Sequence, residues 1–418
     1  SATGGGGGTT GGGGGTTGGG GGTTGGGSGT GGGSTGVEQL FLRTTLDGGT
    51  NQAVYRAAPP TSAAALVSNG PLRTNGLGVS PDGTRIAVTY NGTSVDTLEV
   101  YPSTGGTALL SYTSTKPELS KPTLSPNNQR VAFLEGASNA DAGFDVYVAP
   151  VTSTPAVQLA SPPRAMNISA LAPGAFAFSA DSRYLAVQGD FSVNGTVELH
   201  VFDTLTSTRT AIIAPTASVT GSVGSFGWAG SNLVVRANLG GAGYRLHTCT
   251  TTGTCAPLVG PGSGGSVEAM SVSPDGTFVV YSSNERISGA WDLYRVAATG
   301  GTPMRLAPDS PTGWRVSGDP VVSPNGQWVA VQVSATSLYV LSTTSTAATL
   351  TPLYTPVAPV GVFDPAFNAA STQLLFRADL LRDGFYDLYR LADFVTPAPP
   401  VLVFDAAGGT IAQFASSY

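Results

Sequence analysis

Ser273-Pro274-Asp275-Gly276, followed by the apolar run Thr277-Phe278-Val279-Val280-Tyr281, is the clearest copy of a phrase that recurs along this chain of 418 residues. Pro presets φ, Asp bonds the local backbone and Gly tolerates φ > 0, so the first four residues predict a tight turn. The β-branched and aromatic run after it predicts a buried strand. The other copies begin at Ser80, Ser125, Ser179 and Ser323.

The spacing of these copies predicts a repeat architecture. Ser80 and Ser125 are 45 residues apart, and Ser125 and Ser179 are 54 apart. Such a period means a supersecondary unit that must stack with its neighbours to bury a core. A third strand follows each turn region, as at Asp292-Leu293-Tyr294-Arg295-Val296, and Gly300-Gly301-Thr302-Pro303 leads into a fourth. Four antiparallel strands per repeat predict an all-β fold made of propeller blades.

Together, the Ser-Pro-Asp-Gly turn, the Asp-Leu-Tyr-Arg-Val strand and the Gly-Gly-Thr-Pro turn resemble the TolB-like propeller repeat. That repeat occurs in the periplasmic TolB protein and in the propellers of prolyl-oligopeptidase-type enzymes. The resemblance covers roughly residues 38 to 418 and implies a fold while saying little about activity.

The number of blades depends on the two ends of the repeat region. Motif-bearing strands occur near seven positions: Ser80, Ser125, Ser179, Trp228, Ser273, Ser323 and Asn368. Residues 40–57 supply second and third strands with no first strand before them, and Thr410-Ile411-Ala412-Gln413-Phe414 resembles a first strand. We therefore predict eight blades, closed by the C-terminal strand, with seven blades as the alternative. The expected domains are a tail at 1–36 and a propeller at 37–418.

Composition limits the partners and favours an oxidising compartment. The net charge is −6 and charged residues make up 11%, so a basic footprint for nucleic acid is absent. The sequence contains no run of 18 apolar residues, so no membrane span is predicted. Cys249 and Cys255 flank a short Gly-containing loop and are predicted to form a disulfide. With a start at Ser1, this predicts a secreted, cell-surface or periplasmic protein.

Residues 1–36 form a Gly/Thr-rich tail of five-glycine blocks separated by threonine pairs. One interpretation is a flexible tether. The other, which the strict pattern favours, is an extended arm that docks onto a second copy of the chain through its backbone. The predicted assembly residues are Gly6, Thr9, Thr10, Gly13, Thr16, Thr17, Gly20, Thr23 and Thr24.

No residue is predicted to be catalytic, to bind a cofactor or to bind a metal. His200 and His247, the only histidines, lie in strand-like stretches, and no Gly-x-Ser-x-Gly elbow exists. Three aspartates at spacing four, Asp379, Asp383 and Asp387, are expected to be turn and strand-end hydrogen-bonders, with calcium as the lesser alternative. The repeated tyrosines are expected to serve blade packing rather than a binding surface: Tyr55, Tyr147, Tyr294 and Tyr389. Three sequons, at Asn91, Asn167 and Asn194, are expected to reflect turn chemistry, because two contain Asn-Gly.

These patterns lead to three hypotheses about function. The first is a non-enzymatic extracellular protein that self-associates head-to-tail through its tail, extending to a filament. The second is a TolB-like surface or periplasmic propeller that binds another protein or a glycan. The third is a propeller enzyme, such as a lactonase or glycosidase, with acidic or histidine residues at the central axis.

Overall fold

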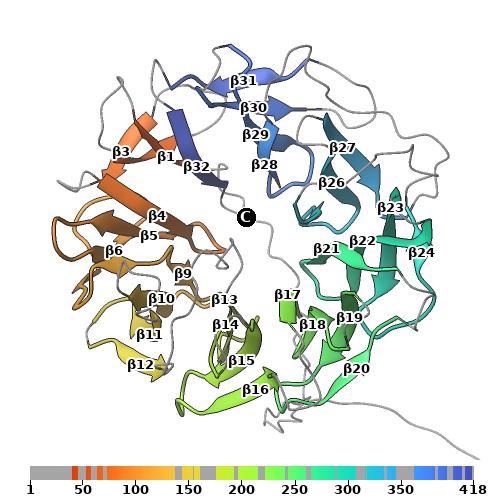
Figure 1. The fold of residues 1–418 in the computed structure, drawn as a ribbon. Coiled ribbons are helices and arrows are strands. Elements are labelled where there is room, and N and C mark those ends of the chain that lie inside the picture. The colour runs from red at the N-terminus through yellow and green to blue at the C-terminus, as the bar shows by residue number, and fades with distance from the viewer. Residues whose placement is uncertain are drawn as a thin grey trace, which may run out of the picture. The chain divides into compact units, whose positions relative to one another are not determined.

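The computed structural model contains eight β-sheets arranged in a ring, so the prediction of an eight-bladed propeller is confirmed (Figure 1). The propeller lies in the second of the two units into which the chain divides, residues 33–418. The structure describes residues 40–45, 53–57, 64–68, 73–136, 144–153, 155–160, 176–192, 196–214, 222–240, 243–259, 265–287, 290–306, 316, 318–333, 337–344, 362–381, 385–392, 399–406 and 410–416.

The first four blades run as follows. Blade one contains β1 (Leu40–Thr45), β2 (Ala53–Ala57), β3 (Ala64–Ser68) and β32 (Thr410–Ser416). Blade two contains β4 (Arg73–Val79), β5 (Arg85–Asn91), β6 (Thr97–Pro102) and β7 (Leu110–Thr113). Blade three contains β8 (Glu118–Leu119), β9 (Thr123–Leu124), β10 (Arg130–Gly136), β11 (Phe144–Pro150) and β12 (Val157–Ala160). Blade four contains β13 (Phe176–Phe178), β14 (Tyr184–Gly189), β15 (Glu198–Asp203) and β16 (Arg209–Ile213).

The last four blades continue around the ring. Blade five contains β17 (Ser222–Ala229), β18 (Asn232–Asn238), β19 (Arg245–Cys249) and β20 (Cys255–Pro257). Blade six contains β21 (Val267–Val272), β22 (Phe278–Ile287), β23 (Ala290–Ala297) and β24 (Met304–Arg305). Blade seven contains β25 (Val321–Val322), β26 (Trp328–Val333) and β27 (Ser337–Ser342). Blade eight contains β28 (Val362–Phe367), β29 (Leu374–Ala378), β30 (Asp387–Leu391) and β31 (Val401–Phe404).

The ring closes as the unmatched end strands predicted. β32 pairs antiparallel with β1, with Leu42 opposite Phe414, and becomes the innermost strand of blade one. The described residues contain no helix that is long and apolar enough to cross a membrane.

The repeated turn forms the hydrogen bonds that its residues predict. In blade two, the Ser80 hydroxyl donates to Asp82 Oδ1 at 2.8 Å, and the Arg85 N–H donates to Ser80 Oγ at 3.0 Å. Gly83 has a φ of 69°, where a side chain is strained. Ser182 occupies that turn position in blade four with a φ of 63°, and its Oγ accepts the N–H of Asn127 from blade three at 3.0 Å. Serine is less favourable than glycine at this positive φ, and here its hydroxyl makes a hydrogen bond to the neighbouring blade.

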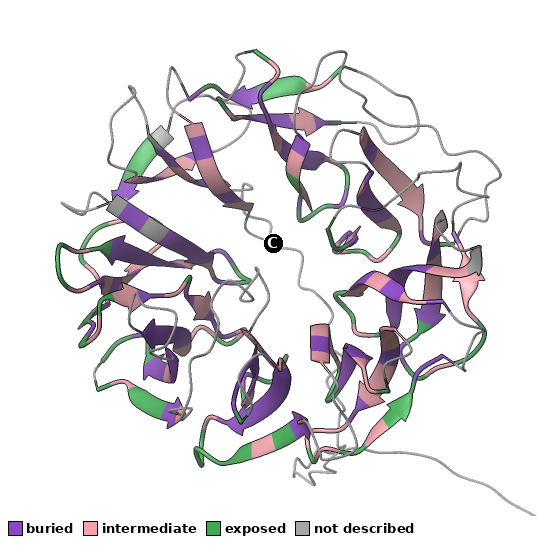
Figure 2. Ribbon diagram, in the orientation of Figure 1, coloured by how far each residue is buried: buried purple, intermediate pink, exposed green. Residues whose placement is uncertain are grey.

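The apolar core lies between neighbouring blades rather than in one centre. Among the described residues, eight clusters of buried side chains each join two adjacent blades. The cluster at the closure joins Leu42 and Ile411 to Leu388 of blade eight. Figure 2 shows buried residues concentrated in the middle strands and exposed residues in outer strands and turns. Each blade therefore stabilises its neighbours, as in other repeat folds.

Candidate functional site at the propeller axis

The innermost strand of each blade faces the propeller axis (Figure 1). We use the name axial site for Lys121 and Asp364, which lie in the innermost segments of blades three and eight, together with Arg43 and Arg377, which lie on the second strands of blades one and eight.

A bulge in β28 places Asp364 at this site. The pairing of β28 with β29 shifts register between Phe363 and Ala366, and Asp364 has a φ of 50°. A non-glycine residue at positive φ costs about 1–3 kcal/mol, and such strain tends to occur at functional sites. The Asp364 side chain is 59% exposed, so water reaches its carboxylate.

Two arginines of the axial site are held by hydrogen bonds to the backbone of the next blade, and one of them also binds Asp364. Arg377 donates from Nε to Asp364 Oδ2 at 2.8 Å and from Nη1 to the Ile411 carbonyl oxygen at 2.6 Å. Arg43 donates from Nη1 to the Thr74 carbonyl oxygen at 3.1 Å. Each guanidinium thus reaches the innermost strand of the next blade, which fixes its charge in place.

Lys121 lies between β8 and β9, where the chain passes very close to β4. A Cβ at Gly76 would lie 2.8 Å from Lys121 Cα, and a Cβ at Gly78 would lie 2.4 Å from the Pro122 carbonyl oxygen. Both positions in β4 therefore require glycine, because backbone cannot move away as a flexible side chain can. Lys121 itself is exposed to solvent.

The surroundings of Lys121 lower the pKa of its amine. Burial by the surrounding protein is the largest cause, the Arg43 guanidinium lowers the pKa further, and the Asp364 carboxylate opposes both. The Lys121 side chain is exposed to solvent, although many protein atoms surround it. A lowered pKa increases the fraction of the amine that is neutral at a given pH, and the neutral amine is the form that acts as a base or a nucleophile.

A further carboxyl with a shifted pKa lies in blade seven, which packs against blade eight. Asp319 precedes β25, and its Oδ1 accepts the Met270 N–H at 3.1 Å. Burial raises the pKa of this carboxyl, and the Met270 N–H and the Arg236 guanidinium partly offset the rise.

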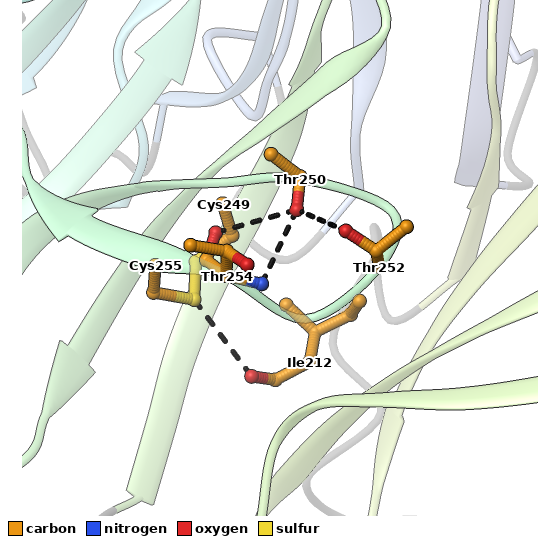
Figure 3. Close-up of a disulfide and its surroundings, with 6 residues drawn as sticks. All are labelled: Ile212, Cys249, Thr250, Thr252, Thr254 and Cys255. Atoms are coloured by element: carbon orange, nitrogen blue, oxygen red, sulfur yellow. Dashed lines mark hydrogen bonds between the residues drawn. A yellow bond between two sulfur atoms is a disulfide. The ribbon is translucent and has the colours of Figure 1, made fainter.

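The predicted disulfide is present in the structure. It joins Cys249 at the end of β19 to Cys255 at the start of β20, with the two Cα atoms 4.1 Å apart (Figure 3). In the loop between them, Thr250 Oγ1 accepts the Thr254 N–H at 3.2 Å and lies 2.8 Å from Thr252 Oγ1. The bridge pins a hairpin on an outer strand and takes no part in the axial site.

Of the histidines, aspartates and tyrosines singled out in the sequence, none that the structure describes is a member of the axial site. His200 is buried in β15 with Nε2 2.8 Å from Glu198 Oε2, and burial lowers its pKa. Asp387 accepts the Ala406 N–H at 2.9 Å, as predicted for a strand-end residue. Three of the repeated tyrosines stack on an aromatic ring of the neighbouring strand in the same blade, and so contribute to blade packing as predicted: Tyr147 on Phe133, Tyr294 on Tyr281 and Tyr389 on Phe376.

Several predictions concern residues outside the described part of the chain. These are the nine assembly residues of the tail, together with Asp383, Asn167 and Asn194. Within the described residues, no group of three His, Cys, Asp or Glu side chains lies close enough together to hold a metal ion.

Sequence reasoning missed the axial site. Lys121 stands out only as one of two lysines in the chain, and Asp364 only as an aspartate before a proline. Neither carries a motif, because the residues of this site meet through the closure of the ring rather than through spacing.

Comparison with known proteins gives structural matches only. No protein-family model and no curated protein sequence matches the chain. An oligogalacturonate lyase solved in complex with manganese matches 85% of this chain and 97% of its own, with 14% identity and a TM-score of 0.54. The dipeptidyl peptidase 4 of Porphyromonas gingivalis matches 84% of this chain with 14% identity and a TM-score of 0.58, and this chain spans 57% of that protein.

TolB from Acinetobacter baumannii also matches, over 64% of this chain and 63% of its own. The identity is 14% and the TM-score is 0.36, so the match supports no argument about family or function. At these identities the lyase and peptidase matches show the fold alone.

These findings contradict the prediction of a non-enzymatic protein that self-associates into a filament. The matched lyase and peptidases are enzymes, and nothing found here indicates a filament. The prediction took the lack of a hydrolase domain as the lack of an active site. However, the lyase is covered over 97% of its length, so an enzyme of this fold needs no second domain.

Proposed function

We propose that this protein is an enzyme that acts on an acidic saccharide at the axial site, by β-elimination. The observation that carries the proposal is a solvent-exposed lysine whose pKa is lowered by burial and by the charge of Arg43, a guanidinium held by a backbone carbonyl. β-Elimination beside a carboxylate needs a base for the carbon-bound proton and positive charge for the carboxylate. Lys121 and Arg43 are groups of those two kinds.

The step balances with the residues at the site. The neutral Lys121 amine takes the proton from the carbon next to the substrate carboxylate. The electron pair of that C–H bond becomes a C=C bond, the C–O bond at the next carbon breaks, and water protonates the leaving oxygen. Arg43 stabilises the negative charge that develops on the carboxylate. The exposed Asp364 carboxylate, held by Arg377, accepts hydrogen bonds from sugar hydroxyls.

The lyase match supports this choice among propeller enzymes, because that chain is a propeller over nearly all of its length. That lyase was solved with manganese, whereas no group of three His, Cys, Asp or Glu side chains among the described residues here lies close enough together to hold a metal ion. The proposed step therefore uses side chains alone.

Lys121→Met tests the proposal, and Lys116→Met is the matched control because these are the only two lysines. Each protein is incubated with oligouronates, and the ultraviolet absorbance of the C=C bond conjugated to the carboxylate is followed. We expect Lys121→Met to lose about 10²- to 10⁴-fold in rate, since a general base contributes that much. Lys116, whose amine pairs with Asp145 at 2.8 Å on the surface, should tolerate the change.

Acetylation of the two lysines across pH gives a second measure that needs no substrate. Lys121 is expected to react with a pKa below the ordinary lysine range. The proposed function would be refuted if wild type showed no activity on any oligouronate tested. It would also be refuted if wild type and Lys121→Met were equally active.

Membership of the TolB-like family remains the second proposal. It is supported by the Ser-Asp turn bonds that recur in blades two, four and six. We also propose an oxidising compartment, which the Cys249–Cys255 bridge supports. Mass spectrometry of protein from its native source, without reductant, tests the compartment: two free thiols would exclude it.

A further inference from the structure

We propose that a pocket between blades two and three binds a neutral saccharide unit. This hairpin pocket has a volume of about 410 Å³ and is lined by residues 91–94, Asp96, Pro117 and Glu118. It lies where the hairpin joining β5 to β6 meets the segment that leads into β8. The volume is within the range of small-ligand sites.

A buried carboxyl fixes the two walls of the hairpin pocket relative to each other. Asp96 is 3% exposed, and its two oxygens accept hydrogen bonds from opposite walls. Oδ1 accepts the Gly92 N–H at 3.2 Å, and Oδ2 accepts the Leu119 N–H at 2.9 Å. A pocket held in this way is formed before its ligand arrives, which lowers the entropic cost of binding.

A second buried carboxyl holds the chain just before the pocket. Glu135 has no exposed surface and accepts hydrogen bonds from the Ser114 hydroxyl at 2.7 Å and the Lys116 N–H at 3.0 Å. These bonds fix the residues that lead into Pro117. Both walls are therefore rigid, although they are built from a hairpin and a connecting segment.

The lining determines the class of ligand. Asn91, Thr93 and Ser94 offer amide and hydroxyl groups, Glu118 offers a carboxylate, and Pro117 offers an apolar ring face. No cation lines the pocket, so an anionic ligand would meet only repulsion from Glu118. An apolar ligand would leave these polar groups without partners. A neutral, hydroxyl-rich ligand such as a sugar unit fits both conditions.

The position of the hairpin pocket links it to the axial site. Glu118 and Lys121 are three residues apart on the innermost segment of blade three. At about 3.3 Å per extended residue, this separates them by roughly 10 Å or less. If the pocket takes part in substrate recognition, a role that rests on the proposed function, it selects acidic saccharides that also carry neutral units.

Ser94→Trp tests the pocket, because Ser94 is exposed and an indole there fills the cavity. Thr252→Trp, in the exposed turn between β19 and β20, is the matched control. Titration calorimetry with neutral galacto-, xylo- and arabino-oligosaccharides measures binding to each protein. We expect saturable binding to wild type and Thr252→Trp, and at least a tenfold loss in Ser94→Trp. Glu118→Gln, which keeps the shape, should weaken binding by about tenfold, as expected for losing a charged acceptor.

Lys121→Met separates this proposal from the proposed function, since it should bind the neutral sugars as wild type does. Absence of saturable binding by all three sugars, or equal binding to wild type and Ser94→Trp, would overturn the hairpin pocket proposal. The proposal would also be overturned if an oligouronate bound more tightly than the neutral sugars and if the Ser94→Trp substitution abolished that binding.

Discussion

Replacement of Glu135 by Ala should destabilise the propeller more than replacement of any exposed carboxylate. Glu135 has no exposed surface. It accepts hydrogen bonds from the hydroxyls of Ser114, Thr115 and Tyr112, at 2.7–2.8 Å, and from the backbone N–H groups of Thr115 and Lys116. Despite its burial, these bonds hold the pKa of the carboxyl below its ordinary value.

The magnitude follows from the burial of the donors. Ser114 is 4% exposed, so its lost bond to a charged acceptor costs about 1.5–3 kcal/mol. The other four bonds involve partly exposed groups that water is able to reach, and we count roughly 0.5 kcal/mol for each. The expected loss for Glu135→Ala is therefore about 3.5–5 kcal/mol in the free energy of unfolding. Glu135→Gln keeps one acceptor oxygen and should lose about half of that.

Urea denaturation followed by fluorescence measures this loss as a shift of the midpoint at constant slope. Glu99→Ala is the control, because Glu99 is partly exposed and accepts a hydrogen bond from the Tyr101 hydroxyl, so its loss should cost less than about 1 kcal/mol. A loss below 1 kcal/mol for Glu135→Ala would refute the reasoning. In wild type, the stabilisation should be present above the ordinary glutamate pKa and lost as the pH falls through the lowered folded-state value.

Three further changes have expected outcomes. Burial lowers the pKa of His200, so its contribution to stability should be present above pH 6.5 and decline as the pH falls through its folded-state pKa. The melting temperatures of wild type and His200→Gln should therefore converge between pH 7 and pH 4. Ser182→Ala keeps the strained φ and loses the bond to Asn127, which should cost about 1–2 kcal/mol, whereas Ser182→Gly should be nearly neutral; equal denaturation midpoints for the two would contradict this. Reduction of the Cys249–Cys255 bridge should cost about 2 kcal/mol or less because the loop is short, and a larger fall in melting temperature than Ser182→Ala causes would show otherwise.

The sequence predicted the fold closely because the fold depends on local chemistry that repeats. The Ser-Pro-Asp-Gly turn forms bonds within five residues, so it is readable from one stretch of chain. The blade count followed because the strand at Leu40 lacked an inner partner that the strand at Thr410 supplies. Periodicity also predicted the stacked tyrosines, since each repeats its neighbours' packing.

The axial site was not predictable in the same way. Lys121 and Asp364 belong to blades three and eight, and the electrostatic effect of one on the other depends on the ring being closed. The hairpin pocket depends on Asp96 reaching Leu119, which are 23 residues apart. Contacts of this kind depend on tertiary geometry, and a repeat pattern in the sequence does not predict them.

The pairing of β32 with β1 has a consequence for how the protein is made. β1, β2 and β3 are synthesised before β32, so that blade stays without its innermost strand until residues 410–416 emerge. The same late strand accepts the Arg377 bond at the Ile411 carbonyl and places Gln413 against the Leu77 carbonyl oxygen at 2.9 Å. A nascent chain interrupted before β32 therefore lacks both the ring closure and the backbone partner of Arg377. The axial site is complete only once β32 has been made, whatever the number of blades already folded.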